Sequence, residues 1–237
     1  MSTRCYVPAL DPASKTLTLG RDIAHHVARV LRMGVGDALV LFDGQGRSTS
    51  ATIMSLSKQA VDVSYESVAV DPPPQPRITL VQSLIKPQAM DPVIRKACEL
   101  GVACVQPVIT EHSVVRSRER PDRWQKAMIA AAEQCGTNWL PAIGEVRSWS
   151  EWLSARGADE PAYICALQDA QPFKAVLREA GTTDRVTICV GPEGDFTADE
   201  LQQAREQGIV PVSLGELTLR ADTAAIMAAA VLRYEFG

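Results

Sequence analysis

The sequence predicts an α/β protein with two domains, a small β-rich domain followed by one built on a mostly parallel sheet. Four of the five residues from Pro72 to Pro76 are proline, and they separate two kinds of hydrophobic pattern. Short alternating segments precede the prolines, whereas strands alternate with helices after them, which is typical of a parallel sheet. Near the end of the chain, two glycine-bearing loops each follow an expected strand, and ligands bind beyond such strand ends in open α/β sheets.

The first expected domain, residues 1–71, has the pattern of a small β-barrel with one helix. Strands are expected at 38–42, 50–54 and 60–65, because these segments are short and rich in strand-forming side chains. A turn is expected after the first of them, in the sequence Asp-Gly-Gln-Gly, and only residues 25–31 have a helical pattern. Residues 72–76 cannot form helix or central strand, so they are predicted to be a stiff Pro-rich linker.

The second expected domain, residues 77–237, alternates strands with helices. Thr197 and Glu200 form a capping-box pattern before one of the helices. Asp222 or Thr223 is expected to cap the last helix. Strands are predicted at 77–82, 105–109, 163–167, 185–190 and 209–214, and helices at 91–100, 123–135, 197–207 and 223–234.

Composition narrows the class of protein. The hydrophobic fraction of 46% suits a packed core, and no apolar run approaches the roughly 18 to 20 residues that span a bilayer. The first residues lack the apolar stretch of a signal peptide. We therefore expect a cytoplasmic protein that does not enter a membrane.

The six cysteines form no Cys-x-x-Cys pair and have no histidine at ligand spacing. We predict that they are reduced core thiols, with no disulfide and no metal site. His25 and His26 are adjacent, so they diverge on a helix and are not expected to bind a metal together.

Charge is unevenly distributed along the chain, although the net charge is only −4. Residues 72–150 carry ten Lys/Arg and seven Asp/Glu, whereas residues 151–237 carry seven and fourteen. Between Arg116 and Lys126, five cations accompany two anions. A local basic patch of this kind can bind phosphates even on an acidic molecule. The same composition also suits the solvated start of a helix.

The two glycine-bearing loops carry the strongest functional signal. Residues 191–194, Gly-Pro-Glu-Gly, offer close backbone approach and one carboxylate, but taken alone they also fit an ordinary tight turn. Residues 214–219 offer apolar walls and free backbone groups. Neither loop has the glycine pattern of a dinucleotide or triphosphate site. The pair therefore suits an adenine ring or a ribose better than a pyrophosphate.

Arg220 stands just ahead of the expected C-terminal helix. A cation is electrostatically unfavourable near the positive N-terminal end of a helix. A nearby anion or a developing negative charge would explain this position. An exposed arginine with its guanidinium in water would also fit it.

Both loops resemble those of the SPOUT class of methyltransferases, and the whole chain is similar to the bacterial family that methylates N3 of a uridine in 16S ribosomal RNA. That family's loops read Gly-Pro-Glu-Gly-Gly and Leu-Gly-x-x-Ile-Leu-Arg-x-Glu-Thr-Ala. Matching blocks extend over nearly the full length of the chain, at residues 25–37, 43–44, 86–90, 96–102, 111–115, 123–124 and 131–135.

Four residues depart from the family pattern. Asp195 replaces the second glycine of the first loop, and Asp222 replaces a glutamate after Arg220. Thr137 stands where many members carry arginine, and Thr218 replaces Ile or Val. The polar residues that matter most to the pattern are retained, namely Glu193, Arg220 and Thr223.

The resemblance implies a trefoil-knotted α/β methyltransferase domain preceded by a PUA-like β-barrel that binds RNA. It implies S-adenosyl-L-methionine as methyl donor, 16S ribosomal RNA within the small ribosomal subunit as substrate, and a homodimer. Carried over residue by residue, the expected cofactor pocket comprises Leu167, Gly191, Pro192, Glu193, Gly194, Leu214, Gly215, Leu217, Leu219, Thr223 and Ala224.

The resemblance also leads to candidate catalytic residues. Uridine N3 must lose its proton to attack a methyl group, so negative charge spreads over the neighbouring carbonyl oxygens. Arg220 is expected to stabilise that charge. Glu193 is expected to orient the base or assist proton removal, unless it only anchors the loop.

RNA phosphates are expected to bind on two surfaces. The first is one helix face of the β-barrel with His26, Arg29 and Arg32, which lie three residues apart. The second comprises Lys86, Arg116, Arg118, Arg123 and Lys126.

Two alternatives stay open. One is a SPOUT methyltransferase that acts on another RNA position, which the cofactor loops alone would not distinguish. The other is a non-catalytic RNA-binding factor for ribosome assembly. That factor would be expected to have decayed cofactor loops, whereas both loops here are intact as far as Arg220.

Overall fold

The computed structural model describes residues 3–119, 121–157 and 160–237. The chain divides into two compact units, one of residues 1–73 with 129–140 and the other of residues 74–128 with 141–237. The chain therefore enters the first unit twice. Helix α3 (Asp122–Cys135) begins in the second unit and ends in the first.

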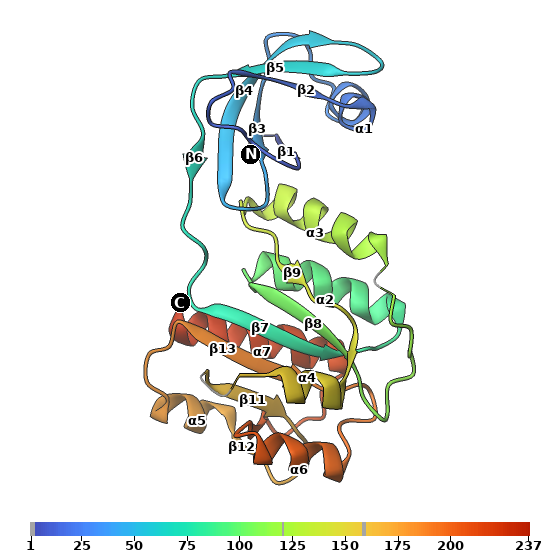
Figure 1. The fold of residues 1–237 in the computed structure, drawn as a ribbon, viewed down its shortest axis with the longest axis vertical. Helices are drawn as coiled ribbons and strands as arrows, with labels where there is room; N and C mark the ends of the chain where they lie inside the picture. Colours follow the sequence, from blue (N-terminus) through green and yellow to red (C-terminus); the bar gives the residue numbers. More distant parts are fainter. Residues whose placement is uncertain (1–2, 120, 158–159) are drawn as a thin grey trace. The chain divides into compact units, whose positions relative to one another are not determined.

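The first unit is built on a six-stranded sheet, drawn mainly in blue in Figure 1. The strands pair in the order β1, β3, β4, β5, β2, with β6 beside β4. The β1–β3 pair is parallel and the other pairs are antiparallel. Their bounds are β1 Arg4–Tyr6, β2 Thr16–Leu19, β3 Ala38–Phe42, β4 Arg47–Leu56, β5 Val61–Tyr65 and β6 Ala69–Val70.

The predicted strands of this unit are confirmed as β3, the middle of β4, and β5. Alternate residues along them are fully buried, among them Leu39, Leu41, Ile53, Val61 and Val63, and they form the core of the unit. The strands β1, β2 and β6 were not predicted. Each has only two to four residues, too few for a periodic pattern to stand out.

The helix of the first unit differs from the prediction. Arg21–His25 forms α1, and His26–Val30 continues it as a π-helical stretch. A π-helix bonds over five residues instead of four, so side chains three apart no longer align. Arg32 lies beyond the helix with φ at 55°, in the left-handed region. The expectation that His26, Arg29 and Arg32 share one helix face is therefore wrong.

The second unit is an α/β structure with an eight-stranded sheet. The strands pair in the order β10, β8, β7, β13, β11, β14, β12, with β9 beside β8, and each of these pairs is parallel. The expectation of a mostly parallel sheet is confirmed. The bounds are β7 Arg77–Ser83, β8 Cys104–Ile109, β9 Ala142–Ile143, β10 Arg147–Ser148, β11 Ala162–Cys165, β12 Gln171–Pro172, β13 Arg185–Val190 and β14 Val210–Ser213.

Helices cover both faces of this sheet (Figure 1). On one face, α7 lies across β7 and β13 beside α2, and the alanines of its inner side permit close approach to the strands. On the other face, Trp149, Trp152 and Leu153 of α4 pack with Leu201 and Ala204 of α6. The bounds are α2 Pro87–Glu99, α4 Trp149–Ala155, α5 Phe173–Glu179, α6 Ala198–Glu206 and α7 Ala221–Phe236.

The predicted elements of this unit are present, with changes at their ends. The capping box is confirmed, since Thr197 Oγ1 accepts from the Glu200 amide at 3.2 Å and Glu200 Oε2 accepts from the Thr197 amide at 2.9 Å. The prediction that Asp222 or Thr223 caps α7 is wrong, because the N-cap is Arg220. Helices α4 and α5 and the three two-residue strands were not predicted.

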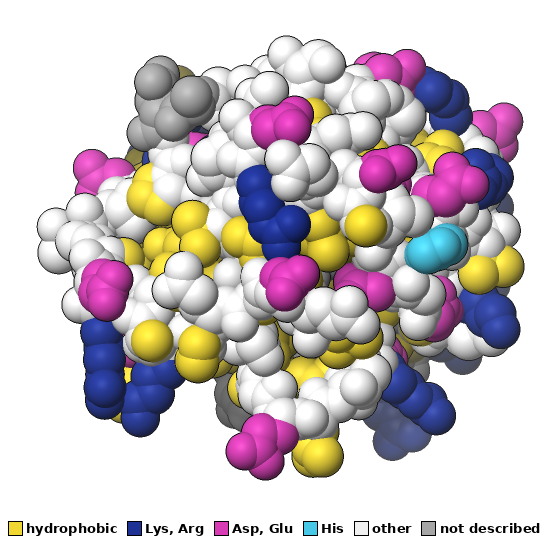
Figure 2. All heavy atoms as spheres, turned by 90° about the horizontal axis from the view of Figure 1, so that it is seen from below, with side chains coloured by type: hydrophobic (Ala, Val, Ile, Leu, Met, Phe, Trp, Pro, Cys, Tyr) yellow, Lys and Arg dark blue, Asp and Glu magenta, His cyan; other side chains and the backbone are white. Residues whose placement is uncertain are grey.

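Figure 2 looks onto the second unit from the side of α5, β12 and α6. Hydrophobic side chains gather in the middle of this face, with basic and acidic side chains between and around them. Among the described residues, no helix is both long and apolar enough to cross a membrane.

Candidate functional site

A pocket opens where three neighbouring parallel strands end. The segments after β11, β13 and β14 line it, together with the start of α7. Because β11 pairs with both β13 and β14, their carboxyl ends bring these segments side by side. The lining residues are Cys165, Ala166, Leu167, Val190, Gly191, Pro192, Glu193, Asp195, Val212, Ser213, Leu214, Gly215, Leu217, Thr218, Leu219, Ala221 and Ala224.

The loop after β13 is held by Asp195. Its carboxylate accepts hydrogen bonds from the amides of Phe196 at 2.8 Å and Leu167 at 3.2 Å, so it ties this loop to the one after β11. Asp195 has φ at 58°, a left-handed conformation in which glycine is strain-free. Gly191 sits against it, since an added Cβ would lie 3.1 Å from Asp195 Oδ1.

The loop after β14 turns at Gly215, whose φ of 141° is one that side chains rarely adopt. The Gly215 amide donates to Ser213 Oγ at 3.3 Å, and the Ser213 hydroxyl donates back to the Gly215 carbonyl at 3.0 Å. Within the described residues, the amides of Leu217 and Leu219 have no hydrogen-bond partner. They are free to bind a ligand.

A buried cysteine, Cys165, contributes an apolar surface to the pocket wall. Cys165 is almost fully buried at the end of β11, and burial together with the charge of Asp195 raises the pKa of its thiol to about 12. The thiol is therefore protonated at neutral pH and behaves as a small apolar group.

The structure brings together most of the residues expected to hold a cofactor. Nine of the eleven line the pocket, whereas Gly194 and Thr223 do not. Gly194 instead lies against His112, which an added Cβ would approach to 3.0 Å. The expected set lacked Asp195, which the sequence marks only as a departure from glycine, and the strand-end residues Cys165, Val190 and Val212.

Of the two expected catalytic residues, Glu193 lines the pocket and Arg220 stands next to its lining. Glu193 lines it with an exposed side chain. Arg220 does not line it, but both of its chain neighbours, Leu219 and Ala221, do. Among the described residues, the exposed Arg220 guanidinium has no hydrogen-bond or ion-pair partner. An uncompensated cation thus stands at the rim, at the positive end of α7.

The cations of the second expected RNA surface all lie exposed near the carboxyl ends of β7 and β8 or on α3. Arg116 donates to the Glu111 carbonyl at 2.6 Å. Arg123 pairs with Asp91 at 2.9 Å, and Arg118 pairs with Glu151 at 3.0 Å. The acidic residues thus neutralise part of this surface. Lys86 and Lys126 have no acidic partner among the described residues.

The second unit is a parallel α/β structure with a pocket between glycine-bearing loops at its strand ends, and the first unit is β-rich. This combination matches a known pair of domains. Residues 72–233 match the model of the RNA methyltransferase domain, and residues 19–64 match that of the RNA methyltransferase PUA domain. The chain belongs to this RNA methyltransferase family.

Individual relatives cover nearly the whole chain. Ribosomal RNA small subunit methyltransferase E of Rickettsia conorii is 32% identical over 97% of this chain and 94% of its own length. The Synechocystis protein of the same name is 30% identical over 97% of this chain and 77% of its own. The Neisseria gonorrhoeae enzyme of that name, solved with bound S-adenosyl methionine, has a TM-score of 0.90 at 32% identity and covers 100% of this chain and 99% of its own.

Substitution of Asp195 tests the strained position in the pocket. Asp195→Ala removes the carboxylate contacts and keeps the left-handed strain, whereas Asp195→Gly removes the contacts and the strain together. We expect the alanine variant to have a free energy of unfolding about 1 kcal/mol lower than the glycine variant. Urea unfolding of both variants measures this difference, and equal stabilities would contradict it.

Proposed function

We propose that this protein methylates N3 of a uridine in 16S ribosomal RNA, with S-adenosyl-L-methionine as methyl donor. The observation that carries the proposal is the pocket at the ends of β11, β13 and β14, formed by the same loops that resemble the uridine-N3 family. The names of the full-length relatives support the small ribosomal subunit as the source of the RNA. Because this substrate belongs to the ribosome, the proposal includes a cytoplasmic location for the protein.

The pocket residues fit this cofactor. The Gly215 turn and the unpaired amides of Leu217 and Leu219 offer hydrogen bonds to an adenine edge between apolar walls. Glu193 and Asp195 place carboxylates in the lining, where a cationic ligand is favoured. When bound, S-adenosyl-L-methionine supplies an electrophilic methyl group on a sulfonium.

Arg220 is assigned to the negative charge that develops on the base. Loss of the N3 proton spreads charge onto the two carbonyl oxygens beside N3, and a cation placed near those oxygens stabilises such charge. Arg220 suits this role because no described acidic side chain neutralises it and the positive end of α7 adds to its field. Glu193, exposed and in the lining, is assigned to orienting the base or accepting its proton.

RNA binding is divided between the two domains. The PUA domain, which we propose spans residues 1–71 ahead of a linker at 72–76, contributes the exposed Arg29 and Arg32 and the half-buried His26. The methyltransferase domain, residues 77–237, contributes Lys86, Arg116, Arg118, Arg123 and Lys126. Phosphate contacts of this type position the RNA, and they leave the choice of base to the pocket.

A homodimer is part of the proposal. The outer side of α7 carries an apolar stripe opposite its buried alanines, formed by Ile226, Met227, Ala230, Val231 and Tyr234. Met227 is 39% exposed and Tyr234 is 89% exposed. Apolar side chains in one row on the face of a helix are typical of a surface that a second copy covers.

The reaction is tested on small ribosomal subunits from a strain that lacks this gene. Incubation with labelled S-adenosyl-L-methionine should yield 3-methyluridine, identified by mass spectrometry of the digested RNA. Naked ribosomal RNA is the comparison, and a preference for subunits would mean that the assembled shape is read. A different methylated nucleoside would mean another target position. If the protein bound the RNA but transferred no methyl group, the alternative of a non-catalytic factor for ribosome assembly would be favoured.

Substitution of Arg220 tests its assigned role of stabilising negative charge on the base. We expect Arg220→Ala to lower kcat for methyl transfer by about 100-fold or more, as loss of a donor to developing charge does elsewhere, with the Kd for S-adenosyl-L-methionine unchanged. Arg178→Ala, which removes an exposed arginine on α5, is the matched control. Full turnover by Arg220→Ala with normal cofactor binding would rule out the assignment.

Sedimentation equilibrium tests the dimer. The chain has a mass of 25.6 kDa, and we expect twice that mass for the unaltered protein. Met227→Glu places a charge in the apolar stripe and should give the monomer mass, while Lys174→Glu on α5 should leave the dimer intact. Monomeric behaviour of the unaltered protein at micromolar concentration would contradict the proposal.

A further inference from the structure

The turn that carries Glu193 contacts His112, a side chain that does not line the cofactor pocket. The Asp195 amide donates to the Pro192 carbonyl at 3.1 Å, so residues 192–195 form a tight turn after β13. His112 belongs to the segment after β8, and its Nδ1 lies 3.0 Å from the Asp195 carbonyl oxygen. The 192–195 turn is therefore held from outside the pocket.

The partner of His112 determines which ring nitrogen carries the proton. The Asp195 carbonyl can only accept a hydrogen bond, so Nδ1 of the imidazole must be the donor. In the neutral ring, Nε2 then carries no proton. Protonation of Nε2 adds a charge and leaves the Nδ1 donor in place. The hydrogen bond is therefore available to both forms of the imidazole.

Gly194 lets the histidine come close to the turn. An added Cβ at Gly194 would lie 3.0 Å from the Cβ of His112 and 3.2 Å from its Cγ. A side chain at this position would have to displace the histidine. His112 thus packs against Gly194 and donates to the next residue, Asp195.

The segment that carries His112 is held by its own hydrogen bonds. The Ser113 amide donates to the Thr110 carbonyl at 3.1 Å, which closes a turn around His112. The Thr110 amide donates to Ser113 Oγ at 3.0 Å, and both of these side chains are buried. The Glu111 amide donates at 2.9 Å to Glu200, whose carboxylate also belongs to the capping box of α6. This anchoring gives His112 a fixed position from which to hold the 192–195 turn.

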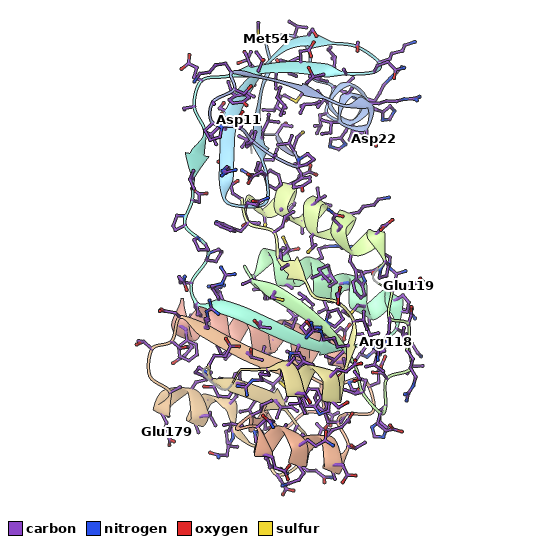
Figure 3. The ribbon with its side chains drawn as sticks, viewed as in Figure 1. Asp11, Asp22, Met54, Arg118, Glu119 and Glu179 are labelled. Carbon is purple, nitrogen blue, oxygen red and sulfur yellow. The ribbon has the colours of Figure 1, made fainter. Side chains whose placement is uncertain are left out.

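The contact joins segments that follow strands on either side of β7. In the sheet β7 lies between β8 and β13, and the hydrogen bond from His112 to Asp195 connects the segments after these two outer strands. Asp195 also accepts from the Leu167 amide, after β11, at 3.2 Å. Arg118, labelled in Figure 3, lies on the same segment as His112, between β8 and α3. One residue, Asp195, thus connects three loops at this edge of the sheet.

We propose that His112 is a positioning residue for the cofactor. Its Nδ1–H holds the Asp195 carbonyl, and this keeps the 192–195 turn, with Glu193, in the conformation that binds S-adenosyl-L-methionine. Asp195 has φ at 58°, a conformation that persists in a residue other than glycine only when its surroundings maintain it. Without the donor, the turn spends time in other conformations, and the apparent affinity for the cofactor falls in proportion. The inference rests on the proposed function only in placing this cofactor in the pocket.

Calorimetric binding of S-adenosyl-L-methionine tests the donor. His112→Leu removes it, and the affinity should fall about fivefold, the loss expected for one hydrogen bond. His112→Asn should bind within about twofold of the unaltered chain, because Asn Nδ2 is bonded to Cγ as histidine Nδ1 is and also donates. His25→Leu, which removes an exposed histidine of the first unit, is the matched control and should leave the affinity unchanged. Unchanged affinity of His112→Leu, or equal weakness of the Leu and Asn variants, would overturn the proposal.

Hydrogen exchange of the protein without cofactor distinguishes positioning of the turn from a general loss of stability. The amides of Asp195 and Phe196 are hydrogen-bonded within the turn, and they should exchange about fivefold faster in His112→Leu. The Ile209 amide, which donates to the Ala204 carbonyl at the end of α6, should keep its rate. In His112→Asn all three rates should match the unaltered chain. Unchanged exchange at Asp195 and Phe196 in the Leu variant, or equal acceleration at Ile209, would contradict the positioning role.

Methyl transfer separates this inference from the proposed function. If the unaltered chain bound the cofactor and the variants showed the expected order of affinities, but no 3-methyluridine was formed, the reaction would be refuted and the role of His112 would stand. If 3-methyluridine was formed while the His112 variants and the unaltered chain bound the cofactor equally, only the role of His112 would be refuted.

Discussion

The parallel pairing of β7 with β13 is the constraint on which the methyltransferase unit depends. These two strands lie at the centre of the sheet, and six consecutive residues of each are in register. Both are buried on both faces, which explains why they appear in the sequence as nearly continuous apolar runs. The carboxyl end of β13 forms one wall of the cofactor pocket, where Val190 and Gly191 line it.

The last helix, α7, packs closely on these two strands because its buried side chains are small. Ala221, Ala224, Ala225, Ala228 and Ala229 are buried along one side of α7, which packs on β7 and β13. Because alanine brings a helix close to a sheet, the first turn of α7 comes to form part of the pocket wall. The same close packing directs its first residue, and with it Arg220, to the pocket rim.

Sequence patterns predicted those parts of the fold that are long or repeated. The strands 77–82 and 185–190 and the helix 123–135 were found within two residues of their ends, because buried runs and amphipathic periods are strong signals. The two-residue strands and the seven-residue α4 and α5 were missed, since they give too few residues for a period. The left-handed turn at Arg32 and the N-cap at Arg220 depend on backbone geometry that local composition does not determine. The knot implied by the resemblance stays a prediction.

The sequence likewise predicted some residues of the site and missed others. Two glycine-bearing loops with flanking leucines, each after an expected strand, indicated the pocket, because ligands bind beyond the carboxyl ends of strands in open α/β sheets. Asp195 appeared in the sequence only as a departure from glycine, and its neighbours did not indicate that its carboxylate would join two loops.

The interrupted course of the first unit has a consequence for how the chain folds during synthesis. Residues 129–140 belong to that unit, where the Tyr6 amide donates to Glu133 at 3.3 Å and Gln45 forms a β-bridge with Trp139. An emerging chain that ends at the proline segment therefore lacks part of its own first unit. The ribosome must add nearly seventy further residues, up to residue 140, before the unit has all of its parts. A fragment cut at residue 73 consequently lacks the part of the first unit that residues 129–140 supply.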